Sequence, residues 1–172
     1  DNMIDYYLVY MFTDNDDWPG NNLKLWRTIN NNSGVYAHDG KWRFIVHDFD
    51  IAYAYEMGAQ DRFTDFVTSD GDTATRQPTW SVKIFQGLFS SEEFRNRLAA
   101  RYSTYASTAF SSDLTIEYLN ELQAARENDI GKDFYRWNLH GTNEISSVTS
   151  WKNGSMKDLR NFLNNRPKSA LN

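Results

Sequence analysis

The chain of 172 residues contains no cysteine, only nine glycines and three prolines, and no apolar run that approaches the roughly 20 residues needed to cross a bilayer. The absence of cysteine excludes disulfides, thiolate metal sites and cysteine nucleophiles. The scarcity of glycine and proline, together with 40% hydrophobic and 24% charged residues, excludes collagen-like and disordered chains. We therefore expect a single globular domain over residues 1–172, with no membrane span in this segment.

The acidic residues are concentrated at the start of the chain. Residues 1–72 carry thirteen Asp and Glu against five Lys and Arg, a net charge of −8, whereas residues 73–172 carry ten against thirteen, a net charge of +3. An excess of carboxylate disfavours a nucleic-acid partner, because the phosphate backbone is itself an anion. Carboxylate oxygens are also the ligands that hard divalent cations take. The pattern fits either a solvated acidic surface or a cation site.

The hydrophobic pattern predicts a mainly α-helical chain with one small β-hairpin, an α+β fold. Residues 1–12 have helical spacing behind a capping Asp1 or Asn2. Residues 23–27 and 41–47 predict the two strands, and residues 48–79 predict a long loop with at most one short helical turn. The remaining helices are predicted at residues 80–89, 92–110 (with a Ser90–Glu93 capping box), 114–130 (capped by Ser112 or Asp113), 132–139 and 147–165, the last ended by Pro167.

Several polar side chains are predicted to meet at one edge of the hairpin. Asp17 and Asn22 bracket a turn-forming stretch that ends where the first strand begins, and the second strand ends in Asp48-Phe49-Asp50. An antiparallel hairpin returns the end of its second strand to the beginning of its first, so Asp17, Asn22 and Asp48 should converge. Phosphoryl transfer requires such groups, a carboxylate at the acceptor hydroxyl and oxygen ligands for Mg²⁺.

In order and spacing these groups resemble the catalytic loop and hairpin of protein kinases, and the chain resembles the CotH-type spore-coat kinases, atypical members of the kinase-like fold. The resemblance runs along nearly the whole chain, through the segments IDYYLVYMF, DWPGNNLKLWR, DGKWRFIVHDFD, FYRW and LRNFLNNR. It implies the C-terminal lobe of that fold and ATP-dependent phosphorylation of protein Ser or Thr, assisted by Mg²⁺ or Mn²⁺. It also implies Asp17 as the catalytic aspartate and Asn22 and Asp48 as metal ligands, with Asp50 assisting the metal.

The sequence departs from the kinase pattern at several positions. Asn15 and Asp16 stand where the kinase loop carries His-Arg, Pro19 stands where it carries Lys, and Asp50 replaces the glycine of Asp-Phe-Gly. No glycine-rich phosphate loop precedes Asp17. We therefore expect a C-terminal lobe separated from its nucleotide-clamping N-terminal lobe, with poor ATP turnover on its own. The family setting suggests a spore-coat or cell-surface location and a Ser/Thr-rich coat or surface protein as substrate.

Two alternatives stay open at this stage. Asp16 and Asn21 have the same spacing as Asp17 and Asn22, so the register of the site is ambiguous by one residue, although Asn22 directly adjoins the strand. The competing function is a non-catalytic surface or coat module in which the acidic loop binds a cation or a partner. An EF-hand is excluded, because Pro19 would occupy the position of its obligatory glycine.

Overall fold

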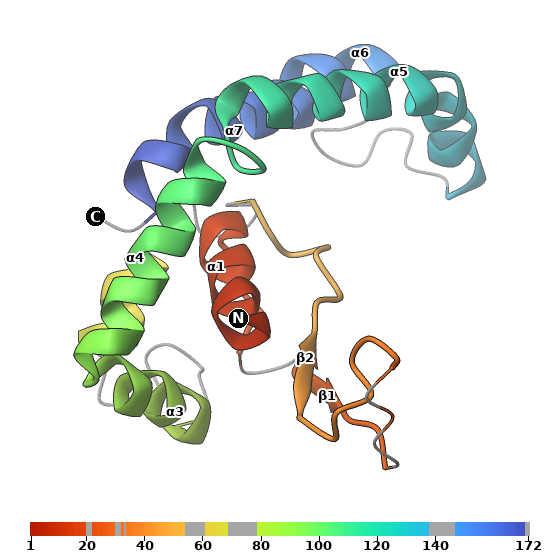
Figure 1. The fold of residues 1–172 in the computed structure, drawn as a ribbon. Helices are drawn as coiled ribbons and strands as arrows, with labels where there is room; N and C mark the ends of the chain where they lie inside the picture. The colour runs from red at the N-terminus through yellow and green to blue at the C-terminus, as the bar shows by residue number, and fades with distance from the viewer. Residues whose placement is uncertain are drawn as a thin grey trace. The chain divides into compact units, whose positions relative to one another are not determined.

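The computed structural model describes residues 1–19, 22–29, 32, 34–53, 61–68, 79–137 and 147–170. It is mostly helical, with one two-stranded antiparallel sheet, as the sequence predicts (Figure 1). The chain divides into two compact units, residues 1–104 with Ala170 and residues 105–169. Within the described ranges, no helix combines the length and the apolar character needed to span a membrane.

The first helix, α1 (Asn2–Thr13), forms the centre of the first unit (Figure 1). Its side chains are buried on several faces, which is typical of a helix enclosed by other elements rather than one lying on a surface. The helix predicted at residues 1–12 is thus confirmed. The predicted cap is only partly right, because Asp1 makes no side-chain capping bond, and Asn2 bonds both the N–H and the C=O of Phe44 instead.

The hairpin consists of β1 (Lys24–Trp26) and β2 (Arg43–Ile45), which pair antiparallel with Leu25 opposite Phe44. The Phe44 ring lies 4.7 Å from the ring of Tyr6 in α1, so this face of the sheet packs on the helix. Both predicted strands are confirmed, although each is shorter than the apolar pattern suggested. Because the strands are antiparallel, the residues before β1 and those after β2 lie at the same end of the hairpin.

The long loop predicted after the hairpin contains a helix of its own, α2 (Arg62–Thr68). Residues 54–60 and 69–78 of that prediction lie outside the described residues. The next helix, α3 (Thr79–Phe89), agrees with its prediction to within one residue. Phe85 of α3 and Phe66 of α2 are buried and meet edge to face at 5.6 Å, which joins these helices to the aromatic core around α1.

Helix α4 (Glu92–Ala106) ends four residues before the predicted position. A turn replaces its last residues, in which Phe110 donates its N–H to the carbonyl of Tyr105. The predicted capping box is wrong, because the Ser90 hydroxyl bonds a carbonyl of α3 and Ser91 accepts from the N–H of Phe94. The capping serine is therefore the next residue, Ser91, which has Phe94 rather than Glu at the third position after it and so forms no capping box.

The second unit is built mainly from α5 (Ser112–Arg136), which joins two predicted helices into one. Gly131 lies between those predictions, but a single glycine costs a helix only about 1 kcal/mol and does not end it. The cap is Ser111, which accepts from the N–H of Leu114, rather than the predicted Ser112 or Asp113.

The predicted C-terminal helix is divided into α6 (Val148–Trp151), a π-helical turn η2 (Lys152–Met156) and α7 (Lys157–Ser169). Pro167 does not end α7 as predicted, but lies inside its last turn. A proline has no N–H to offer the carbonyl four residues earlier, here Leu163. The Ser112 hydroxyl donates to that carbonyl at 3.3 Å, so an outside donor replaces the missing bond.

Candidate active site

Two aspartates in the loop after α1 are held by one cation. Arg62, the first residue of α2, donates from Nε to Oδ1 of Asp14 over 2.6 Å and from its guanidinium terminus to Asp16. Arg62 and Asp14 are only 5% and 0% exposed, so water screens this ion pair little. Because the Asp16 carboxylate is engaged in the interior, the structure favours Asp17 over Asp16 as the acid available to a substrate.

Between these aspartates, Asn15 joins the loop to the strand end that carries Asp48. Its Oδ1 accepts the N–H groups of Asp17 and Trp18, each at 3.0 Å. Its Nδ2 donates to the backbone carbonyl of Asp48 at 2.8 Å. Asn15 is 1% exposed, and all three contacts are to main-chain groups. One side chain therefore connects the two segments on which the predicted site residues lie.

Trp18 anchors the loop in the aromatic core. Its indole is fully buried, donates Nε1–H to the hydroxyl of Tyr6 at 2.8 Å, and stacks on the rings of Tyr10 and Phe66 at 4.9 Å and 4.7 Å. A large buried aromatic with its polar atom satisfied is a strong fixed point. Asp17 thus stands directly before a residue that cannot move without disturbing the core.

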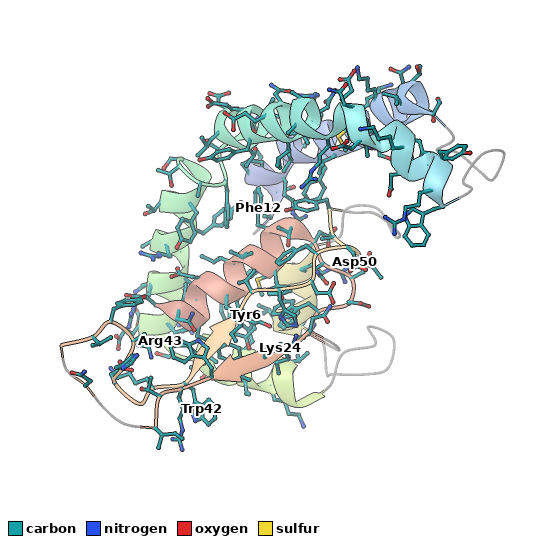
Figure 2. All side chains as sticks on the ribbon, turned by 90° about the vertical axis from the view of Figure 1, so that its right-hand side faces the viewer. Tyr6, Phe12, Lys24, Trp42, Arg43 and Asp50 are labelled. Atoms are coloured by element: carbon teal, nitrogen blue, oxygen red, sulfur yellow. The ribbon has the colours of Figure 1, made fainter. Side chains whose placement is uncertain are left out.

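The end of β2 is fixed by α1. The Tyr10 hydroxyl donates to the carbonyl of His47 at 2.6 Å and accepts its N–H at 3.1 Å. Asp48 follows with a φ of 62°, in the left-handed region that Asp tolerates better than most residues. This turn leaves the Asp48 side chain exposed beyond the hairpin. In Figure 2, Asp50, two residues later, lies well apart from Trp42, which precedes β2.

The carboxyl groups of Asp48, Asp50 and Asp17 influence one another. Hydrogen bonding to Asp50 raises the pKa of Asp48, and desolvation and the charges of Asp50 and Asp17 raise it further, against a lowering effect of His47. Neighbouring carboxylates repel each other when both are ionised. Of the four predicted site residues, Asp48 therefore interacts with Asp50 and feels the charge of Asp17.

Asn22 lies at the entrance of β1. If the register that sets Lys24 opposite Ile45 continues for two residues on each strand, Asn22 faces His47, the neighbour of Asp48. Its φ is 59°, and its Nδ2 is buried without a hydrogen-bond partner among the described residues. The backbone thus sets Asn22 near the other site residues, while its side-chain contact with Asp48 stays a prediction.

The donor chemistry of these residues suits a hard cation. No three His, Cys, Asp or Glu side chains in the described ranges converge closely enough to enclose a metal ion. Mg²⁺ seldom needs such a cage, since it usually keeps several waters and takes one or two carboxylates together with substrate phosphates. Carboxylate oxygens, such as those of Asp48 and Asp50, and amide oxygens, such as that of Asn22, are the donor types that such a cation takes.

Comparison with known proteins identifies the family. The family model described as CotH kinase protein matches residues 1–170. The chain belongs to this family. No curated protein and no solved structure matches it. The resemblance drawn from the sequence is confirmed, and the CotH match includes every residue of the candidate site.

Three residues that organise this CotH site were not predicted from the sequence. Asn15 was noted only as a departure from the kinase loop, Trp18 as part of a turn, and Arg62 was not noted at all. A tryptophan inside a run of turn-forming residues is a signal that sequence reasoning can use, because it is too large and apolar for an exposed turn. Nothing local in the sequence pairs Arg62 with Asp14, since 48 positions separate them.

Proposed function

We propose that this CotH-family chain is the C-terminal, kinase-like lobe of an atypical protein kinase that transfers phosphate from ATP to Ser or Thr of a coat or surface protein. The observation that supports the proposal is that the Asn15 side chain bonds the main chain of both Asp17 and Asp48, which joins the loop after α1 to the end of the hairpin. The order helix, loop, hairpin and aspartate, now seen in three dimensions, supports the same reading.

Asp17 is the proposed catalytic residue. It would accept the hydrogen bond of the substrate hydroxyl and orient its oxygen toward the γ-phosphate, as an acid in this position must for an in-line transfer. Its backbone N–H is held by Asn15 and the next residue is the buried Trp18, so the carboxylate is presented from a fixed backbone. Such preorganisation is the main contribution that a protein makes to phosphoryl transfer.

Asn22, Asp48 and Asp50 are the proposed ligands of Mg²⁺ or Mn²⁺. When bound there, the metal would neutralise the phosphate oxygens of ATP. The raised pKa of Asp48, caused first by its hydrogen bond to Asp50 and further by desolvation and the charges of Asp50 and Asp17, supports this assignment, because it indicates a second carboxyl group close to the first. The only cationic side chain bonded to the loop among the described residues, Arg62, is already held by Asp14 and Asp16.

In this proposal the nucleotide is clamped jointly with an N-terminal lobe. Residues 1–16 contain no Lys or Arg, and Pro19 stands where the kinase loop places a phosphate-binding lysine. The described part of the chain therefore supplies the acid and the metal ligands but little positive charge for the γ-phosphate. Catalysis is expected from the full-length protein, whereas metal binding is expected already from this chain.

The test has one arm for the metal and one for the reaction. We expect the chain to bind Mn²⁺, followed by electron paramagnetic resonance, and Asp48→Asn to abolish that binding. The matched control is Asp39→Asn, which removes an exposed carboxylate at the other end of the same hairpin. In the full-length protein with labelled ATP and Mn²⁺, we expect phosphate incorporation that Asp17→Asn and Asp48→Asn eliminate.

The two arms separate the competing functions. Mn²⁺ binding without phosphate transfer by the full-length protein would identify a cation-binding coat or surface module instead of a kinase. Undiminished transfer by the Asp48→Asn protein would remove the metal assignment.

A further inference from the structure

We infer that Asn15 is a positioning residue of the site, one that holds the Asp48 carboxylate beside Asp17; its role in metal binding rests on the proposed function above. The inference starts from the three hydrogen bonds of the Asn15 side chain. Two of them, from Oδ1 to the N–H groups of Asp17 and Trp18, stay within the loop. The third, from Nδ2 to the carbonyl of Asp48, crosses 33 positions of sequence.

An ordinary turn-forming asparagine would not need this third bond. Asn32 provides the comparison within the same chain, because its Oδ1 also accepts a backbone N–H two residues ahead, that of Gly34 at 3.2 Å. Asn32 is exposed, whereas Asn15 is 1% exposed. The Oδ1 contacts of Asn15 explain the turn, and only the Nδ2 contact relates the turn to Asp48.

The bond from Asn15 to the carbonyl of Asp48 matters because of where it lies among the other bonds of this region. The residue before Asp48 is fixed by the Tyr10 hydroxyl. After Asp48, the backbone N–H of Asp16 donates to the carbonyl of Ile51, and the N–H of Tyr53 donates to the carbonyl of Thr13 at the end of α1. These bonds lie on either side of Asp48. Asn15 alone, among the described side chains, bonds both the main chain of Asp17 and that of Asp48. It therefore holds the main chain at Asp48 against that at Asp17, the two points from which their carboxylates extend.

The test uses Asn15→Ser, because a serine hydroxyl can still accept the N–H groups of the turn but is too short to reach Asp48. The backbone bonds to Ile51 and Tyr53 remain, so the variant is expected to fold. Asn32→Ser is the matched control, since it makes the same substitution in an exposed turn of the same kind. Should Asn15→Ser fail to fold, Asn15→Thr keeps the same hydroxyl acceptor, fills more of the buried site and is likewise too short to reach Asp48.

The first measurement is independent of metal and of activity. At pH 7 we expect Asp17→Asn to shift the carboxyl ¹³C resonance of Asp48 in the native background, since the two charges are neighbours. In the Asn15→Ser background most of that shift should disappear, and in the Asn32→Ser background it should persist. An equal shift in both backgrounds would overturn the inference, because Asp48 would then keep its place without Asn15.

The second measurement is Mn²⁺ affinity of the same chains. We expect the dissociation constant to rise at least tenfold in Asn15→Ser and to change less than twofold in Asn32→Ser. If the resonance arm succeeds and the native chain binds no Mn²⁺, the positioning role stands and the proposed metal site fails. If Asn15→Ser binds Mn²⁺ as tightly as the native chain, Asn15 does not position the metal ligand and the inference is refuted.

Discussion

The buried ion pair of Arg62 offers a severe test of the structure, because it joins α2 to the loop that carries the candidate acid. We expect Arg62→Met to destabilise the chain strongly. The variant keeps the volume of the aliphatic side chain and removes the charge, so Asp14 and Asp16 are left without their partner. Breaking a buried pair by removing one member is costly, since the remaining charge is neither solvated nor compensated.

The structure sets the magnitude. Side chains at 6% exposure for Arg62, 0% for Asp14 and 6% for Asp16 place this network among buried ion pairs, for which removal of one partner costs about 3–5 kcal/mol. Oδ2 of Asp16 already lacks a hydrogen-bond partner among the described residues, so the variant has little local compensation. Arg62→Lys should cost about 2 kcal/mol, because one ammonium group cannot reproduce the fork that engages both carboxylates.

The assay is urea unfolding followed by tryptophan fluorescence and circular dichroism at pH 7 and again at lower pH. A buried carboxylate without a partner binds its proton more tightly in the folded than in the unfolded chain, so the deficit of Arg62→Met should shrink as pH falls. Arg101→Met is the matched control. Its double hydrogen bond with Asp5 is partly exposed, with side chains at 42% and 29%, and its loss should cost less than about 1 kcal/mol.

Two results would refute this reasoning. A deficit for Arg62→Met no larger than that of Arg101→Met would mean that Arg62 is not buried between the two aspartates. A large deficit that stays constant with pH would trace the loss to packing rather than to uncompensated charge.

Further predictions concern the strand end, the loop anchor and α7. Asp50→Asn should lower the pKa of Asp48 toward its usual range, which an NMR titration measures. It should also stabilise the metal-free chain at pH 7. That gain should disappear as pH falls, because protonation relieves the repulsion in the native chain, and thermal unfolding at several pH values measures it. Trp18→Phe should cost about 1–3 kcal/mol in urea unfolding, because the Tyr6 hydroxyl loses its donor and the core loses stacked area. Ser112→Ala should cost about 1 kcal/mol in the same assay, since it removes the hydroxyl that donates to two carbonyls of α7.

The elements that the sequence predicted well are those whose signal is local. The helix at residues 1–12 and the two strands of the hairpin follow from periodicity and from turn residues within a dozen positions. The pairing of β1 with β2 then set Asn22 and Asp48 at the same end of the hairpin, as the chain order had suggested. The α+β fold class, and the hairpin end at which the predicted site residues lie, were therefore accessible from sequence alone.

The failures have a different origin. Pro167 was expected to end its helix, and the hydroxyl that makes α7 tolerate it belongs to Ser112, 51 positions away from the carbonyl it bonds. Likewise, the only reason in the sequence to prefer Asp17 over Asp16 was that Asn22, its partner in spacing, directly adjoins the strand. The preference comes from Arg62, which binds Asp16 across 46 positions. Both outcomes depend on a partner that is far away in the sequence, and a single sequence does not reveal which residue that partner is.

The aspartates near the candidate site form a buried group, paired with Arg62, and an exposed group that includes Asp48. Asp14 and Asp16 face inward, and the positive charge of Arg62 leaves the three side chains together with a net formal charge of −1. Asp48, with its carboxylate exposed, feels the charges of Asp50 and Asp17, so this group tolerates its repulsion only because water screens it. A divalent cation would relieve that repulsion directly, and its binding should therefore stabilise the folded chain in proportion to the logarithm of its concentration above the dissociation constant. In the proposed function, the surface carboxylates, rather than the total acidity of residues 1–72, are thus the part of the charge pattern that a cation would use.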